Sequence, residues 1–353
     1  MKIDKGELSQ KISKLKKAVP KKTPMTALQG ILVSGGYLTA TNMEVTVKAK
    51  INAVEEEPFI IPAKAFDLIG GLPDGLVEVI PDSRGRSFSV TIKADKIKNK
   101  QQTMNPQLFP EPDADETGGT FTIRAEKLLA SMRRVSYAIP LVSTRQSICS
   151  LYMHAGGGSL NFVGADGHMI AWDRQDFDGD FKLLIPKETV DRILSIGFAG
   201  DVSICYGRNW ATFATEEYEI RTRIVEGNYF EYTRMFSELP LRTAVVRSEL
   251  LGCMVRAKMC TEEKAPARIT IGGSEMSIEV RDATTEYHET VSVAGEIRDG
   301  FTIGFGKNLM IETLKAFDCE NVAVSLQSSK MPIIIEAEDS DFKAAVLPVV
   351  LAA

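Results

Sequence analysis

Hydrophobic positions near the amino terminus recur with the period of an α-helix. Leu8, Ile12, Leu15 and Val19 fall at offsets of 0, 4, 7 and 11 residues. At about 100° per residue these side chains share one narrow stripe, and lysines project from the opposite side. The pattern predicts an amphipathic helix over residues 5–19 that packs its apolar face on a sheet.

The same pattern returns twice further along the chain, which indicates an internal repeat. A copy shifted by 120 residues consists of Leu128, Met132, Val135 and Ile139, and a looser third copy starts at Leu251 and Val255 but has Lys258 in the stripe. A second helix also recurs, over residues 61–69, 185–193 and 306–314. Two helices per repeat are therefore predicted.

Between the helices, apolar and polar residues alternate, which is typical of half-buried strands. Residues 45–51, 88–92 and 322–326 show this alternation. Turns are predicted at Gly35-Gly36, Pro81-Asp82 and Gly156–Gly158. The alternating runs predict antiparallel sheets beneath the helices.

Composition marks two breaks between the repeats. A polar, proline-rich stretch runs from Pro106 to Gly119 and includes Asp113 and Asp115, and a second break lies around Ser237 to Leu241. We therefore expect an α+β protein of three similar domains, each with two helices on an antiparallel sheet. The expected domains are residues 1–117, 118–239 and 240–353.

Charge is distributed unevenly along the 353 residues. The net charge is −5, yet residues 1–22 hold eight lysines against Asp4 and Glu7, a local +6 that leaves −11 for the rest. A basic segment in an acidic chain creates a local positive electrostatic field that can attract an anionic partner. A lysine-rich helix face that is merely solvated would have the same composition.

The cysteines and the apolar runs point to a soluble cytoplasmic protein. No apolar run approaches the roughly 18 residues of a membrane span, and the amino terminus lacks a signal pattern. The five cysteines lack metal or disulfide spacing and are expected to be small buried hydrophobes: Cys149, Cys205, Cys253, Cys260 and Cys319.

Motifs for catalysis are missing from the sequence. It contains no phosphate loop and no nucleophile elbow, and its three histidines lack ligand spacing. Asp166 and His168 form a conceivable acid–base pair, but no nucleophile accompanies them. We predict no catalytic residue, no metal and no cofactor.

Several short motifs, in order and spacing, resemble the bacterial sliding clamp family, the beta subunit of DNA polymerase III. The most specific is Val163–Ala171 (VGADGHMIA). Others are Ile61–Lys64, Gly71–Gly75, Glu226–Tyr232, Ile303–Phe305, Cys319–Val322 and Val346–Pro348. Together they cover essentially the whole chain.

The resemblance implies a ring of six domains, made by two chains arranged head to tail, that encircles duplex DNA without reading its sequence. Basic helix faces would line the hole and attract phosphates. The residues expected to face DNA are Lys14, Lys17, Lys21, Lys22, Arg133, Arg134, Lys187, Arg192, Arg256 and Lys307.

The resemblance also implies an apolar cleft between the second and third domains that binds a short peptide of the replicative polymerase, the clamp loader and repair factors. The cleft residues carried over are Arg145, Ile148, Ala165, Gly167, His168, Met169, Ile170, Phe230, Arg234, Met235, Pro332, Leu347, Pro348, Val349 and Val350. Phe230 replaces a common proline, and Met169 and Val350 replace often basic residues. The cleft is therefore expected to be more apolar than in many relatives.

Two other functions compete with a sliding clamp. One is a clamp-shaped scaffold that binds proteins but does not encircle DNA, because Cys260 and Thr261 are less apolar than the usual pair at the subunit contact. The other is an enzyme acting on nucleic acid, which the missing carboxylate and histidine clusters disfavour.

Overall fold

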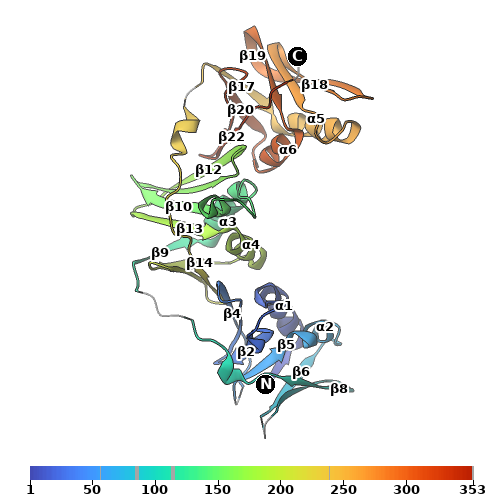
Figure 1. The fold of residues 1–353 in the computed structure, drawn as a ribbon, viewed down its shortest axis with the longest axis vertical. Helices are drawn as coiled ribbons and strands as arrows, with labels where there is room; N and C mark the ends of the chain where they lie inside the picture. The colour runs from blue at the N-terminus through green and yellow to red at the C-terminus, as the bar shows by residue number, and fades with distance from the viewer. Residues whose placement is uncertain (56, 84–86, 113–115, 238, 352–353) are drawn as a thin grey trace. The chain divides into compact units, whose positions relative to one another are not determined.

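The computed structural model describes residues 1–55, 57–83, 87–112, 116–237 and 239–351, and Figure 1 labels the helices and strands along the chain. The chain divides into two compact units. Unit 1 comprises Met1–Leu129 and Asp191–Ile224, and unit 2 comprises Ala130–Val190 and Val225–Ala353. Of the predicted breaks, Asp113, Asp115 and Glu238 lie outside the described residues.

Unit 1 contains two antiparallel sheets. Four strands pair in the order β1-β6-β7-β8 and eight in the order β5-β2-β3-β4-β16-β15-β14-β9. Their bounds are β1 (Lys2–Asp4), β2 (Gly30–Ser34), β3 (Tyr37–Thr41), β4 (Val45–Lys50), β5 (Phe59–Pro62), β6 (Leu76–Asp82), β7 (Phe88–Ala94), β8 (Ile97–Thr103), β9 (Gly119–Arg124), β14 (Asp201–Tyr206), β15 (Trp210–Ala214) and β16 (Tyr218–Arg223).

Unit 2 contains a ten-stranded antiparallel sheet in the order β13-β10-β11-β12-β22-β21-β20-β17-β19-β18. The strands are β10 (Ser150–Gly156), β11 (Ser159–Ala165), β12 (Met169–Asp176), β13 (Phe181–Pro186), β17 (Leu241–Val246), β18 (Ala267–Arg281), β19 (Glu286–Phe305), β20 (Asn321–Leu326), β21 (Ile333–Ala337) and β22 (Lys343–Val346). The alternating runs predicted as strands are confirmed as β4, β7 and β20.

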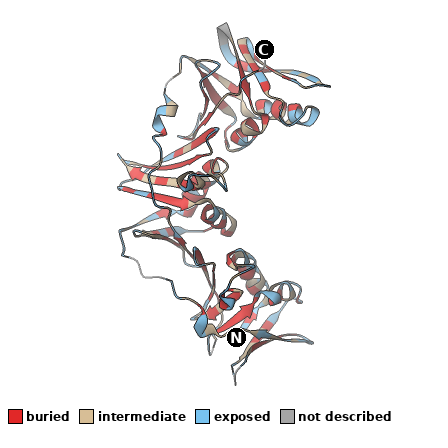
Figure 2. Ribbon diagram, in the orientation of Figure 1, coloured by how far each residue is buried: buried red, intermediate tan, exposed pale blue. Residues whose placement is uncertain are grey.

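Helices follow the same order three times: a first helix after a strand, then strands, then a second helix. They are α1 (Lys5–Leu15), α2 (Phe66–Gly70), α3 (Ala125–Ser136), α4 (Lys187–Ile196), α5 (Arg247–Cys260) and α6 (Lys307–Lys315). Buried residues follow the strands and the inner faces of the helices in each unit (Figure 2). The predicted α+β class and the threefold order of elements are confirmed.

The third copy of the first helix fits the repeat better than the sequence pattern suggested. Its buried stripe is Leu250, Cys253, Met254 and Ala257. The predicted stripe through Leu251, Val255 and Lys258 was wrong by one residue, because α5 begins 242 residues after α1, whereas the predicted alignment assumed a shift of 243. Lys258 is therefore exposed and does not interrupt the core.

Two other local predictions need correction. Gly35-Gly36 and Gly157-Gly158 have positive φ and form tight turns as predicted, but Pro81 and Asp82 end strand β6 and pair with β7. Of the cysteines, Cys253 and Cys319 are buried, whereas Cys260 is exposed at the end of α5. In the part of the chain that the structure describes, no helix is long and apolar enough to cross a membrane.

Strand pairing joins one repeat to the next. In unit 1, β4 of the first repeat pairs antiparallel with β16 of the second, for example Val47 with Ile220. In unit 2, β12 of the second repeat pairs antiparallel with β22 of the third, for example Ile170 with Ala345. Because each pairing extends a sheet across two repeats, each compact unit contains one complete junction between repeats.

Candidate functional site

An apolar cavity of about 350 Å³ opens in unit 2, beside the pairing of β12 with β22. Its walls come from four places along the chain. They are the segment before β10, the turn between β11 and β12 with the strand residues beside it, the segment before β17, and the neighbouring strands β21 and β22 with the residues next to them. The lining residues are Arg145, Ile148, Ala165, Gly167, Met169, Ile170, Phe230, Met235, Pro332, Ala345 and Leu347.

The turn between β11 and β12 is held in place by the Asp166 carboxylate. Its Oδ1 accepts hydrogen bonds from the backbone N–H groups of His168, at 2.8 Å, and Met169, at 2.9 Å. Gly167 has φ of +91°, which glycine adopts without strain. The turn places Ala165, Gly167 and Met169 along one wall. The contact between Asp166 and His168, considered above as an acid–base pair, is a hydrogen bond that stabilises this turn.

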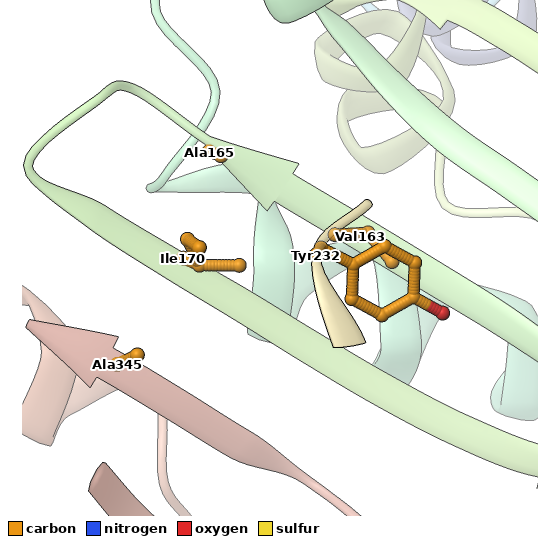
Figure 3. Packing of buried hydrophobic residues seen from close by; sticks show 5 residues of the cluster. All are labelled: Val163, Ala165, Ile170, Tyr232 and Ala345. Carbon is orange, nitrogen blue, oxygen red and sulfur yellow. The ribbon is translucent and has the colours of Figure 1, made fainter. Parts of the chain in front are cut away.

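A small apolar cluster supports the cleft from the sheet side. It joins Val163 and Ala165 of β11, Ile170 of β12, Ala345 of β22 and Tyr232 (Figure 3). Tyr232 comes from an irregular segment and is 3% exposed, so its ring fastens that segment to the sheet. Phe230 and Met235, on either side of Tyr232, are thereby held at the cavity.

Aromatic rings extend this support. The ring of Tyr152 stacks on Tyr229 at 4.8 Å and on His154 at 4.6 Å between centroids, and Trp172 lies edge-on to Tyr232 at 5.2 Å. Such pairs add about 0.5–1.5 kcal/mol each beyond burial. The wall that carries Phe230 is therefore ordered before any ligand binds.

His154 should make unfolding depend on pH. Its Nε2 lies 2.9 Å from the Tyr232 hydroxyl, and burial, then Lys182, lower the His154 pKa below its ordinary 6.5, with Glu231 opposing. Below about pH 6.5 the unfolded chain therefore takes up a proton before the folded one, so the free energy of unfolding falls on acidification. In His154→Gln, the urea concentration at the unfolding midpoint should change less between about pH 7.5 and 5.5 than it does in the parent. Identical pH profiles would contradict this assignment.

The cleft presents little charge. Arg145 is exposed at the rim, Met169 is 7% exposed and Phe230 is 38% exposed. An apolar floor with one cation at its edge suits a short segment that has large apolar side chains and an acidic or carbonyl-rich end.

Five residues predicted for the cleft are not among its lining residues: His168, Arg234, Pro348, Val349 and Val350. The His168 carbonyl instead accepts from Leu347 N–H at 2.8 Å, and the Val349 N–H donates to Gly304 of β19 at 2.8 Å. The tail after Leu347 thus runs along β19, where Leu351 packs over Gly304, and the side chain of Val350 is 97% exposed.

Sequence reasoning missed Ala345. It lies in a short apolar run with Ala344 and Val346, which is compatible with a buried strand but does not show which neighbour that strand covers. Among the described residues, no group of three or more His, Cys, Asp or Glu side chains is arranged to hold a metal ion.

The basic residues predicted to face DNA fall into groups with different surroundings. Lys17, Lys21, Lys22 and Arg133 are exposed, on or just after the first helices of the first two repeats. Lys187 is half-buried at the start of α4. These four exposed side chains can bind a polyanion without any loss of core packing.

Lys14 and Arg134 make contacts within the chain. The Lys14 amine donates to the Ser195 carbonyl and, at 3.2 Å, to the Ile196 carbonyl at the carboxyl end of α4. A cation there complements the negative end of the helix dipole. Arg134 lies 3.3 Å from the buried Asp173 and 3.8 Å from Asp318. Both side chains therefore have structural roles.

Three further residues predicted to face DNA are either paired with a carboxylate or buried. Arg256 makes a two-point ion pair with Glu289, in which its Nε lies 3.0 Å from Oε2. Arg192 and Lys307 are 6% and 1% exposed, so they leave the set of surface cations predicted from sequence. Lys307 donates to Thr261 Oγ1 at 2.7 Å and to the Glu262 carbonyl at 2.6 Å, and burial lowers its pKa.

Comparison with known proteins agrees with the resemblance read from the motifs. Residues 242–350 match the family model described as "DNA polymerase III beta subunit, C-terminal domain". The "Beta sliding clamp" of Pseudomonas aeruginosa is 24% identical over 323 residues, covering 88% of this chain and 87% of that protein. The protein of the same name from Escherichia coli K12 is 22% identical over 310 residues, covering 85% and 84%.

Solved structures show the same fold. A protein from Eubacterium rectale described as a DNA polymerase III beta subunit superimposes with a TM-score of 0.90 at 24% identity, covering 99% of this chain and 98% of that one. A sliding clamp from Pseudomonas aeruginosa bound to griselimycin superimposes with a TM-score of 0.92 at 21% identity, covering 99% of each chain. The predicted resemblance is confirmed for sequence and fold.

Proposed function

We propose that this protein, which resembles bacterial DNA polymerase III beta subunits along nearly its whole length, is a DNA sliding clamp. It encircles duplex DNA without reading sequence, tethers the replicative polymerase and confers processivity. It has no catalytic site of its own. The observation that carries the proposal is the threefold order of elements with exposed cations on or just after the first helices, in a fold that matches sliding clamps.

The three domains are proposed to span residues 1–117, 118–239 and 240–353. The threefold order of strands and helices supports these bounds. The two compact units differ from them because β4–β16 and β12–β22 pairing ties parts of the middle repeat to its neighbours.

A head-to-tail homodimer completes the ring in this proposal. Strand pairing builds two junctions between repeats within each chain, and junctions of the same kind at both contacts between two chains would close the six domains into a ring. The lining of the hole is proposed to include Lys17, Lys21, Lys22 and Arg133. Weak, sequence-independent attraction from these side chains permits sliding, while closure of the ring prevents escape.

The apolar cleft is proposed to bind short peptide segments of the polymerase, the clamp loader and repair factors. Its volume, its single rim cation and its preordered aromatic support suit a peptide with large apolar anchors. A cytoplasmic location at the replicating nucleoid follows from this function and belongs to the same proposal.

Small-angle X-ray scattering of the purified protein tests the ring. The expected result is a mass of twice 38.8 kDa and a distance distribution with a central hole. A monomer without a hole at every concentration would contradict the ring. That result would favour the alternative, a clamp-fold scaffold that binds proteins without encircling DNA.

A further inference from the structure

The first helix of each repeat carries a cation at its tenth residue. Counting from the first residue of α1, α3 and α5, the tenth residues are Lys14, Arg134 and Arg256. The three helices begin in the same way, because the N–H of each first residue donates at 2.9 Å to a carbonyl in the loop after the second helix: Lys5 to Gly75, Ala125 to Gly200 and Arg247 to Glu320. The three cations are therefore equivalent by position and by backbone anchoring.

Two of these cations reach the end of the second helix of the following repeat. Lys14 of the first repeat contacts the Ser195 and Ile196 carbonyls at the end of α4. Arg134 of the second repeat lies 3.8 Å from Asp318, three residues after α6. In both cases positive charge meets the negative carboxyl end of a helix or an acidic residue next to it. This contact is a recurring part of the junction between repeats.

The third cation is held within its own repeat. Arg256 pairs with Glu289 of β19, and this hydrogen-bonded pair holds the pKa of Glu289 at about 2. The pair uses Nε and one terminal nitrogen of the guanidinium. Since a guanidinium has five N–H groups, donors remain for a second acceptor. The Arg256 side chain is 54% exposed and accessible to a partner.

The matching acidic end lies in the first repeat. Asp74 follows α2 by four residues, much as Asp318 follows α6 by three. Its side chain is 98% exposed and lies 3.2 Å from Lys5. Exposed apolar side chains accompany both charges: Leu76, 72% exposed, lies two residues after Asp74, and Met259, 80% exposed, lies three residues after Arg256 on α5. The two surfaces are complementary in charge and in apolar character.

We propose that in the dimer Arg256 of one protomer contacts Asp74 and the carboxyl end of α2 of a second copy of this chain. The contact between chains then repeats the one that Lys14 and Arg134 make within the chain. This inference rests on the homodimer of the proposed function and assigns two residues to its interface. Glu289 holds the guanidinium in place before the second copy arrives.

A double-mutant cycle tests the contact. The dissociation constant of the dimer is measured by sedimentation equilibrium for the full-length parent, Arg256→Gln, Asp74→Asn and the double variant. Each single substitution should raise the dissociation constant about tenfold, because it leaves a charge at the interface without its partner. The double variant should be no weaker than either single variant, since the two residues act through one contact.

Lys315→Gln is the matched control. Lys315 is an exposed cation on α6, ion-paired with Glu312 at 3.0 Å, and its loss should leave the dimer unchanged. Thermal melting of each variant checks folding, which also covers the loss of the Lys5–Asp74 ion pair in Asp74→Asn. A dimeric parent with additive effects in the cycle, or with no effect from either single substitution, overturns this inference alone. A parent that stays monomeric at the highest concentration overturns the proposed dimer itself.

Discussion

Reversing the charge of Lys17, Lys21 and Arg133 together should lower the affinity for duplex DNA by roughly a hundredfold at moderate salt. Each phosphate contact contributes about 0.9 to the slope of log affinity against log salt, so three lost contacts flatten that slope by about 2.7. The three side chains are exposed, and charge reversal there disturbs no buried partner. Fluorescence anisotropy with a labelled duplex at several salt concentrations measures both quantities.

The choice of residues matters in this experiment. Lys14 and Arg134 hold the end of α4 and the buried Asp173, so reversing them would disturb the fold as well as any DNA contact. A matched control reverses three exposed cations that lie outside the helices: Lys96, Arg208 and Lys330. If the control triple weakens DNA binding as much as the test triple, the affinity reflects net charge and the proposed lining is wrong.

Placing a carboxylate at Leu347 should reduce binding of a polymerase-derived peptide about a hundredfold. Leu347 lines the apolar cavity, and its backbone N–H is fixed to the His168 carbonyl at 2.8 Å. In Leu347→Asp the new charge enters a cavity that Ile170 and Met235 also line. Enclosing it under a bound peptide costs about 3 kcal/mol. Isothermal titration with a peptide that binds the unaltered protein measures the loss.

Val350→Asp is the control for this substitution. It introduces the same charge into the same tail, but the Val350 side chain is 97% exposed and absent from the cavity wall. Peptide affinity should remain within about twofold of the parent, because a solvated charge at this distance is screened. Equal losses in the two variants would mean that the tail acts through its overall charge and that the cleft assignment fails.

The cleft illustrates what a motif conveys and what it leaves open. The Val163–Ala171 stretch carries the resemblance, and in the structure it contains the turn between β11 and β12, with Gly167 at a positive φ. The same stretch did not indicate that His168 contributes its carbonyl to the tail and is not part of the wall. A wall composed of segments distant in sequence depends on packing, as Ala345 shows, because its apolar neighbours in β22 do not indicate what the strand covers.

The basic residues also show which features the sequence predicts and which depend on tertiary packing. Periodicity identified which side of each helix is polar, and Lys17 and Arg133 are exposed as that pattern requires. Arg192 and Lys307 are equally polar in sequence and yet are buried. Charge alone does not distinguish a solvated cation from one that is enclosed by neighbouring carbonyls, as Lys307 is by Glu262.

The sequence by itself determined the threefold repeat, the apolar stripes of the helices, the alternating strands and the family that the chain resembles. These features follow from local periodicity and from the order of short motifs, which need no knowledge of distant contacts. Only the tertiary structure decided which cations remain free, which tail residues leave the cleft and how strands β4 and β12 bind the following repeat. Each of those depends on a partner far away in the sequence, such as α4 for Lys14 or β19 for Val349, and no local pattern specifies that partner.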